Sequence, residues 1–321
     1  MTKPRSHLRL LLLILFGLLS AIAAHNLLCE QELTLSRGPW FRYELRGTKD
    51  FSIIVLPDTQ NYVKEKRNEH ILLKQISWII QNKNRLNIKF VIQVGDIVST
   101  WNSDRQWQAA DRAFSRLEKH QIPYSLAVGN HEHEKSDTRG ATTGFDQYFS
   151  ADRFTAQPWW GGHYNRNTNS YQLLSINDEN YIFLSLDWCP SADEIQWAKD
   201  VLLNQYPKRK AILTTHGYLD DKTANRSGIN GCDPTEYIFN DLIRQVPNLQ
   251  IVLSGHEHDQ DGTATRVDLN LAGKPVYQIM TDYQSEPNGG NGWLRILRFV
   301  PEEQKIYLKT YSPHLNSSKD H

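Results

Sequence analysis

The sequence is poor in cysteine and has no cysteine motif. Three cysteines, at 29, 189 and 232, are spread over 321 residues, and none belongs to a Cys-x-x-Cys pair. This spacing argues against a zinc site built from thiolates, which needs closely spaced cysteines. In an oxidising compartment Cys189 and Cys232 can form a disulfide, and two unpaired thiols are the alternative. Either way, Cys29 is left over.

The sequence also lacks an excess of basic residues. Lysine and arginine number 36, and aspartate and glutamate number 36. Without the three basic residues before position 10, 33 basic residues stand against 36 acidic ones, a net charge of −3 with neutral histidine. Proteins that bind phosphate backbones or anionic membranes generally carry a basic excess. The balance therefore argues against a nucleic-acid-binding module and against general nucleic-acid binding, although it does not exclude a nuclease.

A long apolar run occurs at the N-terminus. Leu10–Leu19 follows three basic residues and precedes the small residues Ala21–Ala24. This order is typical of a signal peptide, so residues 1–24 are predicted to be cleaved and the protein to be exported, periplasmic or extracellular. An uncleaved membrane anchor is the alternative, although the run is short for a span of about 20 residues. A lipoprotein anchor at Cys29 is disfavoured because Leu27 and Leu28 precede it. Membrane association is expected only if the leader is retained.

The rest of the chain suits one large domain. We expect a polar lead-in over residues 25–50, the domain over 51–312 and a tail over 313–321. Within the domain, residues 132–169 are rich in glycine, threonine, asparagine and aromatic residues, with a short helix expected near 144–150. Such a long irregular segment is predicted to be an insertion, either an ordered lid or ordinary surface packing.

Apolar runs and helical patterns alternate between residues 51 and 128. Phe51–Leu56 is predicted as a buried strand, since five of its six residues are apolar. Helical spacing predicts helices around 72–80 and 107–117, before the strands Ile88–Val94 and Tyr124–Val128 respectively. The order β-α-β-α-β predicts an α/β sheet with right-handed crossovers.

The second half reads as more strands with two helices. A hairpin is predicted from Tyr171–Ile176 and Tyr181–Leu186 around residues 177–180. Ser191 and Glu194 form a capping box for a helix through Gln205, and another helix is expected to start at 233–236 with Pro234 at its first position. The other expected strands are Lys210–Thr214, Leu249–Leu253, Thr263–Leu269, Pro275–Thr281, Trp293–Phe299 and Lys305–Thr310.

Five of the predicted strands end in potential metal ligands. Because the carboxyl ends of strands in an α/β sheet line one crevice, we expect these five turns to converge. Only oxygen and nitrogen donors are present, which suits Mn, Fe, Zn or Co. Each turn alone is a weak signal, but their joint order predicts a metal site. The residues are Asp58 and Gln60, Asp96, Asn130 and His131, His216, and His256 and His258.

These motifs resemble those of the calcineurin-like metallophosphoesterase superfamily. Its pattern is D-x-H, G-D, G-N-H-D/E, a lone His and G-H-x-H, and the resemblance covers about residues 51–260. Here the pattern stands as Asp58-Thr59-Gln60, Gly95-Asp96, Gly129-Asn130-His131-Glu132, His216 and Gly255-His256-Glu257-His258. The resemblance implies an α/β (α+β) fold of four layers, in which two mixed β-sheets pack as a sandwich flanked by helices.

The resemblance also implies a centre of two divalent metal ions, with Mn, Fe or Zn expected. Asp96 would bridge them; Asp58, Gln60 and His258 would complete one site, and Asn130, His216 and His256 the other. Metal-bound hydroxide would attack a phosphomonoester or phosphodiester directly, without a covalent enzyme intermediate. His131 would act off the metals as general acid. Glu132 would either keep the pKa of His131 high or form a loop salt bridge.

One position departs from the pattern. Gln60 stands where the commonest pattern has histidine, and its neutral amide oxygen is a weaker donor. A non-catalytic or weakly active metal-binding protein with the same fold is therefore the alternative function. The loop at Asp282–Gln284 is either part of the crevice rim or an ordinary turn. His133, Arg139 and His163 are either phosphate-binding or surface residues. Specificity is expected in 132–169 and 217–232, but the sequence does not indicate which phosphoester is the substrate or the oligomeric state.

Overall fold

The computed structural model describes residues 34–36, 47, 49–135 and 139–319. The predicted leader (1–24) and most of the predicted lead-in (25–50) lie outside these residues. The chain divides into two units, 1–34 and 35–321, and the description below concerns the second. None of the helices formed by the described residues has the length and apolar character to cross a membrane.

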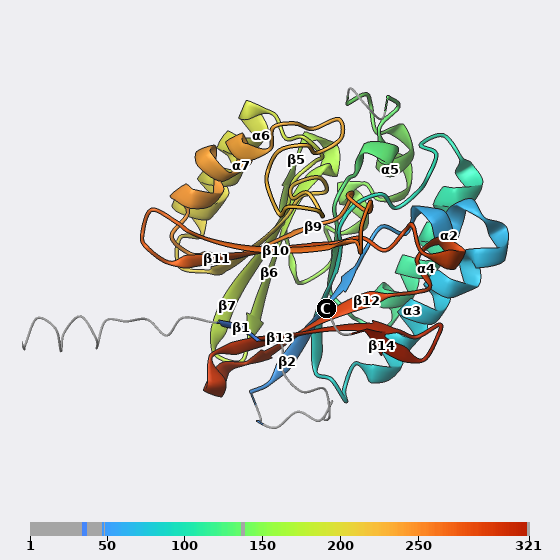
Figure 1. Cartoon of the computed structure of the whole chain (residues 1–321), viewed down its shortest axis with the longest axis horizontal. Helices are drawn as coiled ribbons and strands as arrows, with labels where there is room; N and C mark the ends of the chain where they lie inside the picture. Colours follow the sequence, from blue (N-terminus) through green and yellow to red (C-terminus); the bar gives the residue numbers. More distant parts are fainter. Residues whose placement is uncertain (1–33, 37–46, 48, 136–138, 320–321) are drawn as a thin grey trace, which may run out of the picture. The chain divides into compact units, whose positions relative to one another are not determined.

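The first sheet is mixed and has the order β1-β13-β12-β2-β3-β4, with β14 paired to β13 (Figure 1). Strands β2, β3 and β4 are parallel, as the predicted β-α-β-α-β order requires, whereas β12 is antiparallel to β2. Its strands are β1 (Thr34–Ser36), β2 (Phe51–Leu56), β3 (Ile88–Gln93), β4 (Tyr124–Leu126), β12 (Leu294–Val300), β13 (Lys305–Ser312) and β14 (Ser317–Lys319).

The second sheet is also mixed and has the order β10-β11-β9-β8-β7-β6-β5. Strands β7, β8, β9 and β11 are parallel, and β5, β6 and β10 are antiparallel to their neighbours. Its strands are β5 (Trp160–Tyr164), β6 (Asn169–Ile176), β7 (Glu179–Ser185), β8 (Lys210–Thr214), β9 (Leu249–Ser254), β10 (Thr263–Leu269) and β11 (Pro275–Thr281).

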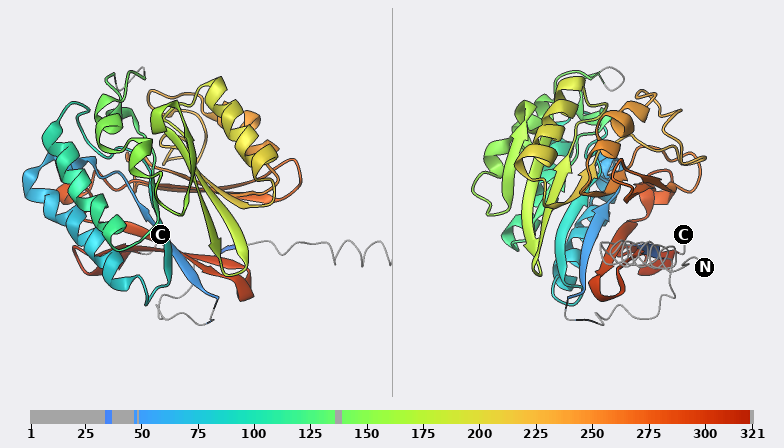
Figure 2. Two further views of the ribbon diagram at one scale, coloured as in Figure 1. Left: turned by 180° about the vertical axis from the view of Figure 1, so that it is seen from behind. Right: turned by 90° about the vertical axis from the view of Figure 1, so that its left-hand side faces the viewer.

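Helices cover the outer face of each sheet. Helices α3 (Glu69–Asn82) and α4 (Asp104–Lys119) lie against the first sheet, and α6 (Ala192–Lys199) and α7 (Glu236–Asp241) against the second (Figure 2). A π-helical segment, η5 (Asp200–Gln205), continues α6. The short helices are α2 (Gln60–Lys64), α5 (Thr143–Tyr148) and α8 (Pro287–Gly290), with 3₁₀ turns η1 (Lys66–Asn68), η2 (Asn130–Glu132), η3 (Ala151–Arg153), η4 (Asn165–Asn167), η6 (Ile243–Gln245) and η7 (Pro301–Glu303).

Aromatic side chains join the two sheets. Phe90 of β3 stacks on Phe183 of β7 with ring centroids 3.9 Å apart. Phe51 of β2 makes an edge contact with Tyr181 of β7 at 5.8 Å. The apolar faces thus pack sheet against sheet, and each sheet also buries an apolar cluster under its helices. The four-layer sandwich is confirmed.

Most element predictions hold, and two are wrong. The capping box of Ser191 and Glu194 is present. Pro234, however, precedes α7, whose first residue is Glu236, because the N-cap Thr235 still has non-helical backbone angles (φ −84°, ψ 5°). Residues 160–164 form β5 inside the segment predicted to be irregular. Phe145 and Phe149 of that segment are buried against α4, so it contributes to the core. A lid function for it stays a prediction.

Candidate metal centre

The predicted ligands come from both sheets. Asp58 follows β2 and Asp96 follows β3 in the first sheet, while His216 follows β8 and His256 follows β9 in the second. All four strands are parallel to a neighbour, so their carboxyl ends lie along one edge of the sandwich. The structure brings these side chains together as predicted.

Glycines permit the close approach of these turns. A Cβ on Gly129 would lie 2.2 Å from Asp96 Oδ1, and a Cβ on Gly255 would lie 2.2 Å from Asp58 Oδ1. Asp96 and His256 have φ values of +52° and +76°, a region that costs energy for residues with a side chain. Strain of this kind is typical of functional sites.

Asp96 is at the middle of the site and is buried. Its Oδ1 is 3.2 Å from His216 Nε2 and accepts the backbone N–H of His131 at 3.1 Å, and its Oδ2 accepts Gln60 Nε2 at 2.7 Å. Burial alone would raise the pKa of Asp96, but the charge and hydrogen bond of His216 and the charges of His131 and His256 hold it well below its usual range. The carboxylate is therefore ionised.

Two buried atoms point to a cation beside Asp96. Asn130 Oδ1 is buried and accepts no hydrogen bond from the described residues. His216 Nε2 is also buried, and its polar neighbours are Asp96 Oδ1 at 3.2 Å and Asp58 Oδ2 at 3.9 Å. Because Nδ1 of His216 donates to the carbonyl of Val94 at 2.9 Å, the neutral ring has its lone pair on Nε2, beside these carboxylates, where a cation would bind it. Ligand atoms of Asp96, His216 and His256 lie within 4.8 Å of one another. This donor set fits a divalent metal ion.

The histidines of this group have opposite pKa shifts. Burial lowers the pKa of His216, but the charge of Asp96 and the hydrogen bond to it outweigh burial, so the net shift is upward. Burial and the charge of His216 lower the pKa of His256 to about 4. His256 is thus neutral at pH 7. Its Nε2 donates to the carbonyl of Asn230 at 2.9 Å, leaving Nδ1 as the free donor atom.

The other half of the site is rich in oxygen. Asp58 is buried, and burial together with the negative charges of Asp282 and Asp96 raises its pKa well above the usual value. Burial also raises the pKa of Asp282, to about 6. Gln284 Nε2 donates to Asp282 Oδ2 at 2.9 Å and to Asp58 Oδ2 at 3.4 Å. The loop after β11 therefore belongs to the crevice. The sequence alone did not decide between this position and an ordinary turn.

Gln60 approaches Asp96 through its amide nitrogen. The same nitrogen donates to Gln284 Oε1 at 2.8 Å. Ligation of a metal by Gln60 Oε1 therefore requires the amide group to turn over. His258, the remaining predicted ligand of this half, has Nδ1 2.6 Å from Ser285 Oγ and lies along the same crevice as Gln60.

Glu132 supports the backbone of the site. It is buried, and its carboxylate accepts the backbone N–H groups of Gly129 at 2.7 Å, Asp96 at 2.9 Å and Val98 at 3.0 Å. The predicted loop salt bridge is wrong, because the carboxylate is occupied by backbone donors. Glu132 thus ties the turn after β3 to the turn after β4.

His131 borders a cavity of about 760 Å³. Its Nδ1 donates to the carbonyl of Ser99 at 2.9 Å, and its Nε2 is 4.0 Å from Asp96 Oδ2. The carbonyl fixes the ring so that Nε2 faces the centre. The other predicted residues on the cavity wall are Gln60, Asp96, Asn130, His256 and His258. They are joined by Asn61, Lys64, Ser99, the segment 228–231, Asp233, Glu257, Asp259 and Gln284.

The three further candidates for phosphate binding lie away from the cavity. His133 is buried, with its ring nitrogens 2.9 Å from Gly140 O and 2.8 Å from Asp187 Oδ1. Arg139 pairs with Asp187 and Glu194, and His163 is exposed on β5. None of the three lines the cavity. His133 and Arg139 instead hold the segment after His131 against the end of β7.

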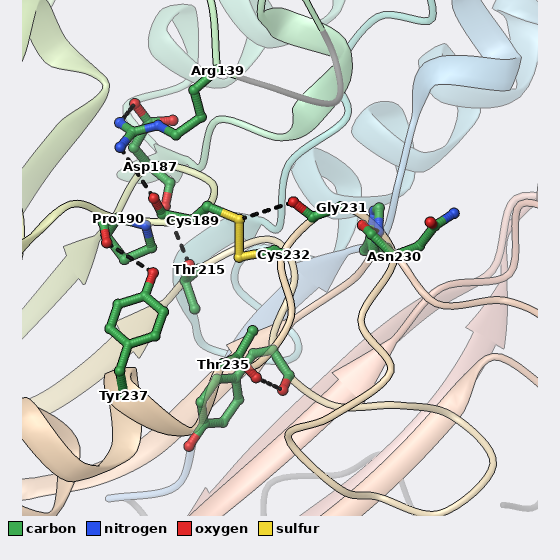
Figure 3. The surroundings of a disulfide bond; sticks show 12 residues. Arg139, Asp187, Cys189, Pro190, Thr215, Asn230, Gly231, Cys232, Thr235 and Tyr237 are labelled. Carbon is green, nitrogen blue, oxygen red and sulfur yellow. Dashed lines mark hydrogen bonds and ion pairs between the residues drawn. A yellow bond between two sulfur atoms is a disulfide. The ribbon is translucent and has the colours of Figure 1, made fainter.

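A disulfide between Cys189 and Cys232 supports one wall of the cavity (Figure 3). Cys189 lies after β7, and Cys232 follows Asn230 and Gly231, both of which line the cavity. The disulfide thus resolves the alternative that the sequence left open between a bridge and two free thiols.

Comparisons with known proteins agree with the geometry. A sequence model described as calcineurin-like phosphoesterase matches residues 51–260. The uncharacterised protein YvnB of Bacillus subtilis (strain 168) is 38% identical over 276 residues, which are 85% of this chain and 21% of that protein. The chain therefore spans about a fifth of the length of this relative.

Two solved structures share the fold. A dimetal phosphatase from Danio rerio has a TM-score of 0.51 at 14% identity, covering 81% of this chain and 95% of that one. A purple acid phosphatase from yellow lupin (Lupinus luteus) seeds has a TM-score of 0.52 at 13% identity, covering 85% and 53%. The family model matches most of the described domain, the chain has this fold, and the motif residues gather at one edge of the sandwich. The chain belongs to the calcineurin-like phosphoesterase family.

Proposed function

We propose that this chain is an exported hydrolase of phosphoric esters that works with two divalent metal ions. The observation that carries the proposal is the buried Asn130 Oδ1, unpaired among the described residues, together with His216 Nε2, which lies 3.2 Å from the ionised Asp96. Burying a polar atom without a partner is unfavourable, and a metal ion bound by Asn130, His216 and Asp96 would supply one. Family membership and the phosphatases with the same fold support the same reaction class.

Each ligand has a role in this proposal. Asp96 would bridge the two ions and offset their repulsion. Asn130, His216 and His256 would hold one ion, and Asp58, His258 and, with its amide turned over, Gln60 would hold the other. When bound, two such ions lower the pKa of a water between them and neutralise the phosphoryl oxygens. Mn, Fe and Zn suit the mixed oxygen and nitrogen donors.

His131 is the proposed general acid. The carbonyl of Ser99 accepts from Nδ1, so a protonated ring presents its second N–H, on Nε2, to the cavity. There it can donate a proton to the leaving oxygen of the ester. The cavity of about 760 Å³ is large enough for a phosphomonoester or phosphodiester with a sizeable organic group.

The alternative function is a non-catalytic or weakly active metal-binding protein. The amide nitrogen of Gln60, directed at Asp96, favours this alternative, because an N–H group does not bind a metal ion. Elemental analysis distinguishes the two: two metal ions per chain support the hydrolase, and one or none supports the alternative.

Export is part of the proposal. The leader pattern over residues 1–24 supports it, and the disulfide is typical of an oxidising compartment. Fractionation of the source cells with N-terminal sequencing tests it. A mature protein that begins near residue 25 outside the cytosol agrees with a cleaved signal peptide. A membrane-bound protein that retains the leader supports an anchor, and a cytosolic protein contradicts export.

Activity is tested on purified chain loaded separately with Mn, Zn, Fe or Mg. Hydrolysis of para-nitrophenyl phosphate is compared with that of bis-para-nitrophenyl phosphate, and Asp96→Asn serves as the control. Metal-dependent hydrolysis of either ester that falls in this variant supports the proposal. No hydrolysis by a chain that holds two ions would contradict it.

A further inference from the structure

Three carboxylates gather outside the predicted catalytic ligands. Asp220 and Asp221 lie in the loop after β8, and Glu257 lies in the turn after β9. Each offers a carboxylate oxygen, and these oxygens all lie within 4.8 Å of one another. Asp221 is 7% exposed and Glu257 is 8% exposed, so two of the three are buried.

Asp221 is only partly satisfied. Its Oδ2 accepts the backbone N–H of Gln260 at 2.6 Å, but its Oδ1 is buried and has no hydrogen-bond partner in the described part of the chain. Polar atoms this deeply buried are nearly always paired, so this oxygen calls for a partner from outside the described residues, an ion or a water.

The cationic side chains near the three carboxylates make their main contacts with other groups. Lys222 forms its ion pair with Asp259, at 2.8 Å. His256 Nε2 is 3.7 Å from Glu257 Oε1, but its N–H is directed at the carbonyl of Asn230. The other contacts of the group come from uncharged donors: the Asn230 N–H to Glu257 Oε1 at 3.1 Å, the Lys222 and Thr223 N–H groups to Asp220 Oδ1 at 3.0 and 2.7 Å, and the Thr223 hydroxyl to the same oxygen at 2.8 Å. These dipoles do not neutralise three negative charges.

Gathering carboxylates in a partly buried place is costly unless a cation compensates their charges. Two oxygens that bind the same Ca²⁺ stand at most about 5 Å apart, twice the usual Ca–O distance of about 2.3–2.6 Å. The separations in this cluster meet that limit. Because the three donors are all carboxylates, the chemistry favours a hard, oxygen-loving ion over zinc or copper.

We propose that Asp220, Asp221 and Glu257 form a calcium site beside the catalytic centre, whose cavity Glu257 also lines. None of the three is a proposed catalytic ligand, so this inference does not rest on the proposed hydrolase activity. The site connects the loop after β8, which forms a cavity wall through residues 228–231, with the turn that carries His256 and His258. Bound calcium holds this wall against that turn.

The test is a calcium titration of the full-length mature chain, followed by calorimetry and by thermal unfolding. Wild-type protein binds one calcium ion per chain at this site and melts at a higher temperature when saturated. Asp221→Asn weakens calcium binding at least tenfold and abolishes the rise in melting temperature. Asp233→Asn, which removes one exposed carboxylate from the same loop, leaves calcium affinity within twofold of wild type.

The melting temperature measured without calcium distinguishes a variant that has lost only the calcium site from one that has lost the fold. Because the carboxylates repel one another, Asp221→Asn without calcium melts at or above the wild-type temperature. If that variant is instead misfolded, Glu257→Gln is titrated in the same way and also loses at least tenfold in affinity. Absence of calcium binding to wild type, or equal affinity in wild type and folded Asp221→Asn and Glu257→Gln proteins, overturns the proposal.

Discussion

His256 Nε2 donates a hydrogen bond to the carbonyl oxygen of Asn230, with 2.9 Å between the two atoms. This bond fixes the imidazole tautomer and leaves Nδ1 free to bind a metal ion. Asn230 is two residues from Cys232, whose disulfide to Cys189 attaches the segment to the end of β7 (Figure 3). A covalent bond outside the centre thus supports the orientation of one of its proposed ligands.

Breaking the disulfide should therefore affect both stability and metal affinity. Cys189→Ser combined with Cys232→Ser is expected to lower the free energy of unfolding by about 2–5 kcal/mol. The loop holding Asn230 becomes freer, so we expect metal affinity to fall about 10- to 100-fold, the usual effect of losing an outer support of a ligand. Urea unfolding and metal titration measure the two effects. Cys29→Ser is the control, and unchanged affinity in the double variant would refute the link to His256.

Asp96→Asn should lose both metal ions. The substitution removes the charge that holds two cations side by side, while nearly preserving the shape of the side chain. Elemental analysis should find less than one ion per chain, and turnover should fall by about 10³-fold or more, because metal catalysis supplies several kcal/mol. Asp193→Asn, at an exposed residue of α6, should keep wild-type metal content. A variant at position 96 that retains two ions would rule out the bridging role.

His131→Ala should lower turnover while retaining the metals. Loss of a general acid costs about 10²–10⁴-fold in rate. The loss should be large for an ester with a poor leaving group, such as an alkyl phosphate, and small for para-nitrophenyl phosphate, whose leaving group needs no proton. Steady-state kinetics on the two esters, with metal content measured in parallel, check this. Equal losses on both substrates would argue against proton donation.

Glu132→Gln should destabilise the fold. The amide oxygen can still accept the N–H groups of Gly129 and Asp96, but the amide NH₂ would then face the N–H of Val98. Leaving the buried N–H of Val98 without an acceptor costs about 1–3 kcal/mol. Urea unfolding measures the change, and Glu134→Gln, two residues on, is the control. A destabilisation no larger than that of the control would contradict the supporting role.

The interaction of His133 with Asp187 should give a pH-dependent stability. Burial alone would lower the pKa of His133, but the hydrogen bond and charge of Asp187 and the carbonyl of Gly140 raise it above 6.5, against the charge of Arg139. A raised folded-state pKa means that the stabilisation is complete below about pH 6.5 and is lost as the pH rises through the folded-state value.

The measurement is the unfolding free energy of wild type and His133→Gln between pH 5.5 and 9. The difference between the two proteins should be largest at the acidic end and should shrink as the pH rises. Both proteins are measured in an Asp146→Asn background, because burial raises the pKa of Asp146 and the charge of His133 lowers it, so the titration of Asp146 would otherwise differ between them. A difference that is constant across the range would show that His133 does not titrate there.

Much of the fold and of the site could be predicted from the sequence, because both depend on side-chain patterns. Phe51–Leu56 is a strand with the predicted bounds, since a short run buried on both faces is apolar throughout. The ligands that follow such runs converge, because parallel strands end at the same edge. Strand β5 was missed because Trp160–Tyr164 contains two glycines and does not alternate.

Other features could not be predicted, because they depend on backbone atoms or on three-dimensional proximity. The carbonyls of Asn230 and Ser99 orient two histidines, yet a carbonyl has no signature in the sequence. Glu132 was misjudged because its three backbone donors come from two separate turns. Asp282 and Gln284 follow a strand of the second sheet far along the chain, and only the packing of that sheet against the first brings them to Asp58.

The origin of the ligands in two different sheets has a thermodynamic consequence. Asp58 and Asp96 follow strands of one sheet, and His216 and His256 follow strands of the other. Ions bound by all four would cross-link the halves of the sandwich, and their binding free energy would add to the free energy of unfolding. A chelator would then lower the melting temperature of both sheets together. The metal concentration in the protein's compartment would then determine the lifetime of the folded protein as well as its catalytic rate.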